Sequence, residues 1–315
     1  MSTAVSYARS KKPLFNAFRN VSRQEVFREF PWLTEQNLQM VTHNDFDGML
    51  TALIMHHVNG WKWIGVYDLK SIHLNEELEE LPKDCVFVDL DVSHQGYRSI
   101  GHHILGDGDN GSLNVNKLFG VDAENFSSKY PLSTAIFLMW LYQLRFEDLS
   151  PLAQAFLVHS DNVWQNYERY TKNVENWLKH LGLHSVLRFF ERKHYLNAMH
   201  KYIHPNTYGR GHQCNFVLKK DGMYHFKESN TSFQSYMDML SRVFQIRRLE
   251  IPKARTFYTF KRQTITSPNR RHTEALEMLS YEKNIFSHAI HTKDEIKLTY
   301  AERVPATNVQ AFIRS

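Results

Sequence analysis

Largely apolar runs and longer helical patterns alternate along the first half of the chain. The runs at residues 38–42, 61–67 and 85–90 have the length and composition of strands, and a shorter run ends at residue 100. The apolar segments at residues 47–59, 133–144 and 151–159 are long enough for helices. Strands that alternate with helices are typical of a parallel sheet whose strands are buried on both faces. The pattern therefore predicts an α/β fold with a doubly wound parallel sheet.

The pattern changes after residue 163, where polar segments rich in aromatic side chains begin. Residues 184–201 predict one amphipathic helix with basic positions, which we interpret as part of a connector. Beyond it, short strands are expected at 214–218, 223–226, 256–260, 285–291 and 295–300, with helices near 233–244 and 273–280. We therefore divide the chain into a flexible basic arm (1–21), an α/β domain (22–165), a helical connector (166–203) and a smaller basic α+β domain (204–315).

Charge is distributed unevenly between the two halves. Residues 1–163 hold 13 Lys and Arg against 20 Asp and Glu, a balance of −7, whereas residues 164–315 hold 25 against 13, a balance of +12. Carboxylates gather cations and a basic surface gathers polyanions, so the two halves are expected to have different ligands. The alternative is that the basic helices are simply well solvated.

The remaining composition places the protein in a broad class. Its only cysteines, Cys85 and Cys214, lack metal-finger spacing, which argues against a disulfide framework. The N-terminus has no apolar core of a signal peptide, and the longest apolar stretch, at 135–142, is too short to cross a membrane. We expect a cytoplasmic protein without a membrane partner, and the oligomeric state stays open.

Acidic and histidine side chains follow the apolar runs at several places. Because the carboxyl ends of parallel strands meet at one edge of a sheet, these groups are expected to converge there. Carboxylate and imidazole ligands together suit Mn²⁺, Mg²⁺ or Zn²⁺. The simpler alternative is a polar turn in which Asp45 or Asp47 caps the following helix. The groups are His43/Asp45/Asp47, Asp89/Asp91, His102/His103 and Asp161.

At these residues the sequence resembles the DHH phosphoesterase superfamily, which includes RecJ-type exonucleases, enzymes that degrade very short RNAs, cyclic-dinucleotide phosphodiesterases and family II pyrophosphatases. The family's His-x-Asp-x-Asp-Gly motif is present in full at residues 43–48. Its strand-ending aspartate matches Asp89, and its aspartate after a helix matches Asp161. Its Asp-His-His motif reads Gly101-His102-His103, so the leading aspartate is absent. The segments 114–116 and 132–135 are similar to the family's Asn and Ser-Thr segments, and the resemblance covers roughly residues 38–165.

The resemblance implies two divalent metal ions, Mn²⁺ or Mg²⁺, and hydrolysis of a phosphodiester by in-line attack of hydroxide. Asp89 would bridge the two ions, so the resemblance gives it a catalytic role together with His103, which would contact the phosphate. The implied ligands of one ion are His43, Asp45 and Asp89, and those of the other are Asp47, Asp89, His102 and Asp161.

The glycine at position 101 raises an alternative to full activity. The missing aspartate normally orients a histidine, and the loss of such a supporting group typically weakens a site by about 10–100-fold. Asp107 or Asp109 are candidates to compensate. A catalytically weak nucleic-acid or nucleotide-binding protein on the same fold is therefore the second hypothesis, and hydrolysis of a small phosphate or a cyclic dinucleotide is the third. Residues 89–93 also resemble the nucleophile motif of haloacid-dehalogenase-type phosphatases, although that motif is expected near the start of its domain.

The basic half offers candidate contacts for a polyanion. Basic doublets lie among aromatic residues, an arrangement typical of single-strand binding, although such aromatics are also typical of core strands. The doublet Arg270-Arg271 stands just before a predicted helix, where cationic side chains and a helix N-terminus combine to grip phosphate. We therefore expect single-stranded nucleic acid or short oligonucleotides as the partner, with DNA against RNA, cleavage polarity and length preference left open.

Overall fold

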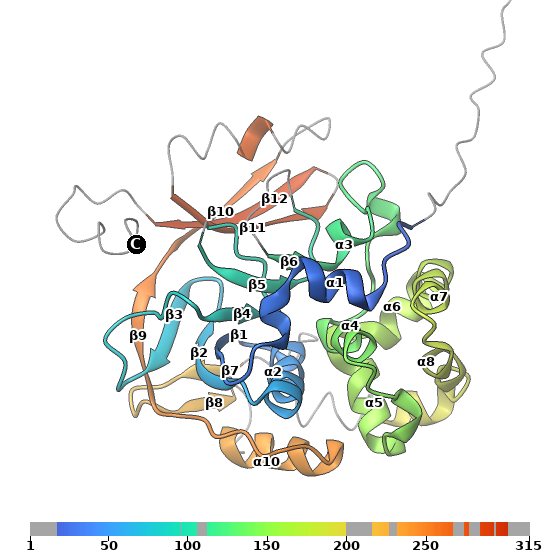
Figure 1. Ribbon diagram of the computed structural model, residues 1–315, viewed down its shortest axis with the longest axis horizontal. Helices are drawn as coiled ribbons and strands as arrows, with labels where there is room; N and C mark the ends of the chain where they lie inside the picture. Colours follow the sequence, from blue (N-terminus) through green and yellow to red (C-terminus); the bar gives the residue numbers. More distant parts are fainter. Residues whose placement is uncertain are drawn as a thin grey trace, which may run out of the picture.

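A seven-stranded sheet forms the centre of the molecule (Figure 1). The computed structural model describes residues 18–94, 96–105, 112–199, 216–226, 232–266, 274–276, 284–292 and 294–301. In spatial order the strands of the sheet are β6 (Leu113–Asn114), β5 (Arg98–Gly101), β4 (Val86–Val88), β1 (Gln39–His43), β2 (Lys62–Tyr67), β3 (Ser71–Asn75) and β9 (Ala254–Thr259).

Five neighbouring strands, from β6 to β2, run parallel to one another. The chain starts in the middle of this group at β1, places β2 on one side, and then places β4, β5 and β6 on the other. The order of the parallel strands is therefore that of a flavodoxin-like sheet. In such a sheet the direction of winding reverses beside the first strand, which here is between β1 and β4. The strands β3 and β9 extend the sheet in antiparallel pairings.

The helices form where the sequence supplies both apolar length and end caps. The α2 helix begins after the Asp45 side chain accepts a hydrogen bond from the Gly48 amide, and it ends at Gly60, whose φ of 67° suits glycine. The helices are α1 (Arg23–Glu29), α2 (Phe46–Asn59), α3 (Val115–Leu118), α4 (Thr134–Leu141), α5 (Pro151–His159), α6 (Val163–Arg169), α7 (Thr171–His180), α8 (His184–Phe189) and α10 (Phe233–Phe244). Short 3-10 turns are η1 (Pro31–Thr34), η2 (Phe126–Ser128), η3 (Phe146–Asp148) and η4 (Ser160–Asn162).

The two faces of the sheet pack against different partners. On one face, Met40, Val86 and Val88 belong to a hydrophobic cluster with the buried residues of α2, α4 and α5. On the other face, Val41 and Phe87 belong to a second cluster. The described members of this second cluster come from strands and loops, and no helix contributes to it. The predicted α/β fold with a parallel core is present, but a doubly wound sheet has helices on both faces, whereas here the second face packs against strands.

Those strands come from the C-terminal part of the chain. Phe260 and Phe286 reach the second face of the central sheet. Isolated bridges join Val92 to Ser287 and Ile104 to Ile290, next to the ends of β4 and β5. A three-stranded antiparallel sheet is built from β10 (Lys261–Thr266), β12 (Glu295–Ala301) and β11 (Asn284–Thr292), and a separate pair is formed by β7 (Phe216–Leu218) and β8 (Tyr224–Phe226).

Two sequence predictions need revision in this region. The single helix expected at 184–201 is broken, because α8 ends at Phe189 and a separate helical stretch occupies 193–199. Phe189 and Phe190 are consecutive and both buried in the same cluster. Two consecutive side chains of a helix point in different directions, so a continuous helix would not place both rings in the same core. The helix therefore ends where both rings are buried. Also, β9 was expected in a smaller C-terminal domain but pairs with β3 of the central sheet.

Helices α4 to α8 gather on one side of the molecule, and β10 to β12 lie at the top of Figure 1. The first hydrophobic cluster contains residues on both sides of the predicted boundaries at 165 and 203, including Phe137, Trp177 and Leu240. The core is therefore continuous across these positions, and the division into domains stays a prediction. Within the described part of the chain, no helix has the length and apolar character needed to cross a membrane.

Candidate metal centre

The acidic and histidine groups converge at the carboxyl edge of the parallel strands. His43 is the last residue of β1, Asp89 directly follows β4, and His102 directly follows β5. The three strands are neighbours in the order β5-β4-β1, and the winding of the sheet reverses between β4 and β1. Ligands bind in open α/β sheets at this kind of switch point, because two adjacent loops leave the sheet in opposite directions there.

The first donor group consists of His43, Asp45 and Asp89. Each residue offers one ligand atom, and these atoms all lie within 4.8 Å of one another. Nδ1 of His43 lies 2.7 Å from Oδ2 of Asp45 and 3.9 Å from Oδ2 of Asp89. One imidazole nitrogen and two carboxylate oxygens form a donor set that fits Mn²⁺, Mg²⁺ or Zn²⁺.

The second donor group consists of Asp47, His102 and Asp161, and its ligand atoms also lie within 4.8 Å of one another. Nε2 of His102 lies 2.8 Å from Oδ2 of Asp161. Asp47 and His102 are buried, whereas the Asp161 side chain is 28% exposed. The chemistry of this donor set is the same as in the first group, and its Asp161 side faces solvent.

Asp89 lies between the two groups. Its Oδ2 is 3.9 Å from Nδ1 of His43, and its Oδ1 is 3.8 Å from Nδ1 of His102. The Thr134 hydroxyl donates to Oδ1 of Asp89 at 2.7 Å and lies 2.8 Å from Nδ1 of His102. Because the hydroxyl gives its proton to Asp89, it accepts one from Nδ1 of His102, which leaves Nε2 of that ring as the ligand atom. Asp89, a member of the first group, is therefore linked to the second group through the Thr134 hydroxyl that it shares with His102.

The backbone at two of these aspartates is held in the left-handed region. Asp89 has φ of 57° and Asp161 has φ of 47°. Aspartate tolerates this conformation better than most residues, but each case still costs on the order of 1–3 kcal/mol, and such strain clusters at functional sites. The left-handed turn directs the Asp89 carboxylate from the end of β4 into the space between the histidines.

Burial and crowding strongly perturb two of the carboxyl groups. Burial and then the Asp161 charge raise the pKa of Asp47 to about 7, against the opposing effect of His102. Burial and the charges of Asp47 and Asp45 raise the pKa of Asp89 well above its ordinary value. Within the described residues, the ion pairs made by the carboxylates of this edge are all with histidines. Buried charges of this kind require cations, so the electrostatics fit a site for positive ions.

Asp45, His43 and His102 are stabilised in their charged forms. Burial opposes ionisation of Asp45, but the charge and hydrogen bond of His43, together with the Gly48 amide, lower the pKa of Asp45 to about 2. Burial also disfavours charged His43 and His102, yet Asp45 raises the pKa of the former and Asp161 raises that of the latter. Each of these histidines therefore sits beside a carboxylate that favours its protonated ring, and cations would compete with protons at both places.

The helix caps expected as the simpler alternative are also present. Oδ1 of Asp45 accepts a hydrogen bond from the Gly48 amide at 2.9 Å, which caps α2. The two oxygens of Asp47 accept from the amides of Thr134 at 2.7 Å and Ala135 at 3.1 Å, which caps α4. Since each carboxylate oxygen has two lone pairs, a cap leaves capacity for a second partner. The caps also fix the carboxylates where the two donor groups need them.

His103 lies at the border of this centre and is 41% exposed at its side chain. Its ring stacks on that of His102, with centroids 5.0 Å apart and planes at 17°. Nδ1 of His103 lies 2.9 Å from Oδ2 of Asp91, so Nε2 is the nitrogen left to meet a ligand. Burial lowers the pKa of His103, which favours a neutral ring.

Some residues of the centre were not identified from the sequence. Thr134 belongs to the Ser-Thr segment noted above, but its contacts to both Asp89 and His102 require the docking of α4 against the sheet. Lys129 is close enough to Asp161 and Asp91 for their charges to raise its pKa, although burial has the larger effect and lowers it. Neither contact has a local sequence signal, because the partners are brought together by distant strands.

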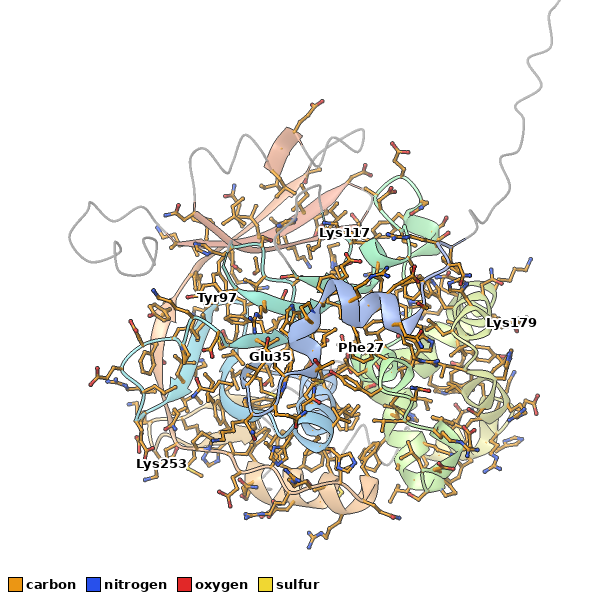
Figure 2. All side chains as sticks on the ribbon, in the orientation of Figure 1. Phe27, Glu35, Tyr97, Lys117, Lys179 and Lys253 are labelled. Atoms are coloured by element: carbon orange, nitrogen blue, oxygen red, sulfur yellow. The ribbon has the colours of Figure 1, made fainter. Side chains whose placement is uncertain are left out.

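The candidate phosphate-binding residues of the basic half lie outside the described part of the chain. Arg270 and Arg271 fall outside the described residues, as do Asp107 and Asp109. Of the aromatic residues in the basic half, Tyr224, Phe226, Phe244 and Phe260 are buried in the core, so they cannot stack on bases. Two of the exposed lysines labelled in Figure 2, Lys179 and Lys253, stand at the edge of the molecule in this view.

Comparisons of the chain with protein-family models, with curated proteins and with solved structures found no match.

Proposed function

We propose that the protein is a divalent-metal-dependent phosphodiesterase of the DHH phosphoesterase type. The observation that carries this proposal is the position of Asp89, a member of the first donor group, close to His102 of the second group at the switch point of the sheet. The proposal is supported by the first group, which matches the ligands that the resemblance implies for one ion, and by the second group, which holds three of the four ligands implied for the other. Crowded, buried carboxylates that pair only with histidines among the described residues support it further.

Each residue has a defined task in this proposal. His43, Asp45 and Asp89 would hold one ion, and Asp47, His102 and Asp161 with Asp89 would hold the other. Two divalent ions supply charge stabilisation at a phosphate and activate a water molecule. Thr134 orients His102 and Asp89 together, so the two groups keep a fixed spacing. His103 presents Nε2 toward the substrate, where it binds a phosphate oxygen or carries a proton.

We infer single-stranded or short oligonucleotides as the substrate class. The inference is supported by the charge balance of +12 in residues 164–315 against −7 in residues 1–163. The doublets Lys219-Lys220 and Lys261-Arg262 are exposed at the surface. A small phosphate needs no extended basic surface, which makes pyrophosphate the weaker candidate.

The test begins with the metal content of the purified wild-type chain after dialysis against Mn²⁺. The expected result is two Mn²⁺ ions per chain, together with hydrolysis of a chromogenic phosphodiester and of a labelled short oligonucleotide. If the protein hydrolyses the diester but not the oligonucleotide, phosphodiesterase activity would be supported and oligonucleotides would be rejected as the substrate class. Two bound ions without any hydrolysis would favour the binding protein, and a chain that retains no Mn²⁺ would overturn the proposal.

A further inference from the structure

Gly101 occupies the position at which the resemblance calls for an aspartate, and its surroundings show why no side chain fits there. A Cβ atom built on Gly101 would lie 2.2 Å from Oδ1 of Asp91 and 2.6 Å from Oδ2. Real Cβ atoms do not approach other atoms so closely, and Asp91 is itself buried and fixed by hydrogen bonds. The space of a side chain at 101 is therefore already filled, and what fills it is a carboxylate.

The Asp91 carboxylate is bound to the histidine that borders the metal centre. Its Oδ2 accepts from the His103 amide at 3.0 Å and lies 2.9 Å from Nδ1 of the same residue. Asn114 donates to Oδ1 of Asp91 at 2.7 Å and to the backbone oxygen of His103 at 2.7 Å. An ionised carboxylate only accepts hydrogen bonds, so this arrangement places a proton on Nδ1 of His103.

We propose that Asp91 is the positioning residue of His103 and replaces, from the loop after β4, the aspartate that is absent at position 101. This proposal rests on the proposed function, since it gives His103 a task at the substrate. In the family motif the carboxylate stands at the end of the strand that corresponds to β5. Here it comes from the loop after β4, and the histidine that it supports is the same. Asp91 is absent from both donor groups, so it acts through His103 and leaves the metal ions in place.

The test exchanges the two positions. Asp91→Gly should lower kcat for a chromogenic phosphodiester by about 10–100-fold, the usual cost of removing a group that orients a catalytic or metal-binding histidine. Gly101→Asp alone should also be impaired, because two carboxylates would compete for one space. The double variant Asp91→Gly/Gly101→Asp should recover most of the lost kcat, and all three should retain two Mn²⁺ ions and a cooperative thermal transition.

The conservative variant Asp91→Asn separates a positioning role from a purely structural one. Its amide oxygen can still accept from Nδ1 of His103, so its kcat should lie between those of the wild type and Asp91→Gly. If Asp91 only supports the fold, the variants would lose thermal stability or metal while kcat per metal-loaded chain stays at the wild-type value. That result, or a double variant no better than Asp91→Gly, would overturn the proposal.

A second measurement keeps this proposal apart from the proposed function. The ¹⁵N chemical shifts of the His103 ring report which nitrogen carries the proton, and they need no activity. The wild type should show a protonated Nδ1, and Asp91→Gly should shift the ring toward the Nε2-protonated form. A wild type with its proton on Nε2 would overturn the role of Asp91. If the shifts are as expected but the protein hydrolyses no phosphodiester, the tautomer assignment would be supported and the proposed phosphodiesterase activity would be rejected.

Discussion

The two donor groups differ in how the chain assembles them. In the first group, His43 and Asp45 come from one turn between β1 and α2, and only Asp89 comes from elsewhere. In the second group, Asp47, His102 and Asp161 come from three separate segments, which meet only when α4, α5 and β5 are in place. The side chains of the first group are at most 16% exposed, whereas Asp161 of the second is 28% exposed.

Because of this difference, the two groups are expected to respond differently to substitutions and to differ in how readily they exchange an ion. The first is set by a short turn and a helix cap, so it should tolerate substitutions elsewhere in the molecule. The second depends on tertiary packing and opens toward solvent, so it should exchange its ion more readily. A substrate phosphate is also expected to approach from the Asp161 side, where His103 lies next to His102.

The largest effect is expected from Asp89→Asn, because Asp89 belongs to the first group and is the residue proposed to bridge to the second. Asparagine tolerates the left-handed backbone, so the change removes charge without adding strain. Both ions should be lost or greatly weakened, and hydrolysis should fall by more than the roughly 10–100-fold typical of a lost supporting group. Metal content and diester hydrolysis measure the outcome. Asp84→Asn, the same change at an exposed position, serves as the matched control.

Asp161→Asn should affect one group only. The expected product binds a single Mn²⁺ ion tightly, because His43, Asp45 and Asp89 are untouched. Hydrolysis should still fall by more than about 10-fold, since the chemistry needs both ions. A metal titration followed by calorimetry distinguishes one tight site from two. Loss of both ions in this variant would show that the groups form one unit and would break the comparison.

Thr134→Val should weaken the second group without removing a ligand. The variant loses the hydroxyl that holds Nδ1 of His102 and Oδ1 of Asp89, and such losses cost about 10–100-fold in metal affinity. Thr134→Ser retains the hydroxyl and should bind Mn²⁺ nearly as the wild type does. Competition with a metal-sensitive dye measures both affinities. The hydroxyl also holds Asp89 of the first group, so both ions should be affected, and unchanged affinity for both would contradict the role of the hydroxyl.

The pH dependence of the metal-free protein is a smaller effect on the whole fold. Asp47 has its pKa raised by burial from 3.8 to about 7, so its stabilising contribution is full below pH 3.8 and is lost as the pH rises through about 7. His43 and His102 have raised pKa values and act in the same direction from pH 6.5 upward. Asp45, with its pKa lowered to about 2, changes only in more acidic solution.

With a chelator present, the midpoint temperature of thermal unfolding should therefore decrease as the pH is raised from 5 to 8. Mn²⁺ at about 100 times its Kd should add roughly 2.7 kcal/mol of stability, and more of it should appear at the higher pH because protons no longer compete. Asp89→Asn removes one of the crowded acids and should give a flatter profile. A midpoint unchanged from pH 5 to 8 would contradict the electrostatic description of both groups.

The smallest effect on the centre is expected from the Arg270→Ala/Arg271→Ala variant. It should bind both ions and hydrolyse a small diester as the wild type does. Its affinity for an oligonucleotide should fall, and the salt dependence of binding should become flatter by roughly one unit of slope for each phosphate that the protein no longer neutralises. Binding to a short single strand at several salt concentrations, in the Asp89→Asn background, measures this. An unchanged salt dependence would show that Arg270 and Arg271 do not bind the phosphates and would point to another basic doublet.

Much of the first half of the molecule could be read from the sequence because its signals are local. Apolar runs give β1, β2 and β4, and the expected helix at 151–159 has the bounds of α5. Parallel strands end at one edge, so the polar residues that follow them had to gather there. The two donor groups contain the six residues expected to hold metal: His43, Asp45, Asp47, Asp89, His102 and Asp161. Their metal-binding roles remain a prediction.

The contacts that refine the centre depend on information that a linear pattern lacks. Asp91 follows Asp89 by two residues, but its filling of the space at Gly101 requires the pairing of β4 with β5. The antiparallel strand β3 was not expected, although the alternation of polar and apolar side chains at residues 71–75 is a strand pattern; the segment is only five residues long and leads directly into an acidic stretch. The pairing of β9 with β3 joins residues about 180 positions apart, and no local pattern encodes such a partner.

That distant pairing has a consequence for how the chain can be shortened. With β9 in place, both edges of β3 are hydrogen-bonded, and Phe286 covers the second face of the sheet beside Phe87. A truncated chain ending near residue 203 would leave β3 as a bare edge and uncover an aromatic surface, the two features that promote aggregation. The residues of the candidate metal centre all lie before residue 165, yet the last strands of the chain are expected to protect this part from aggregation.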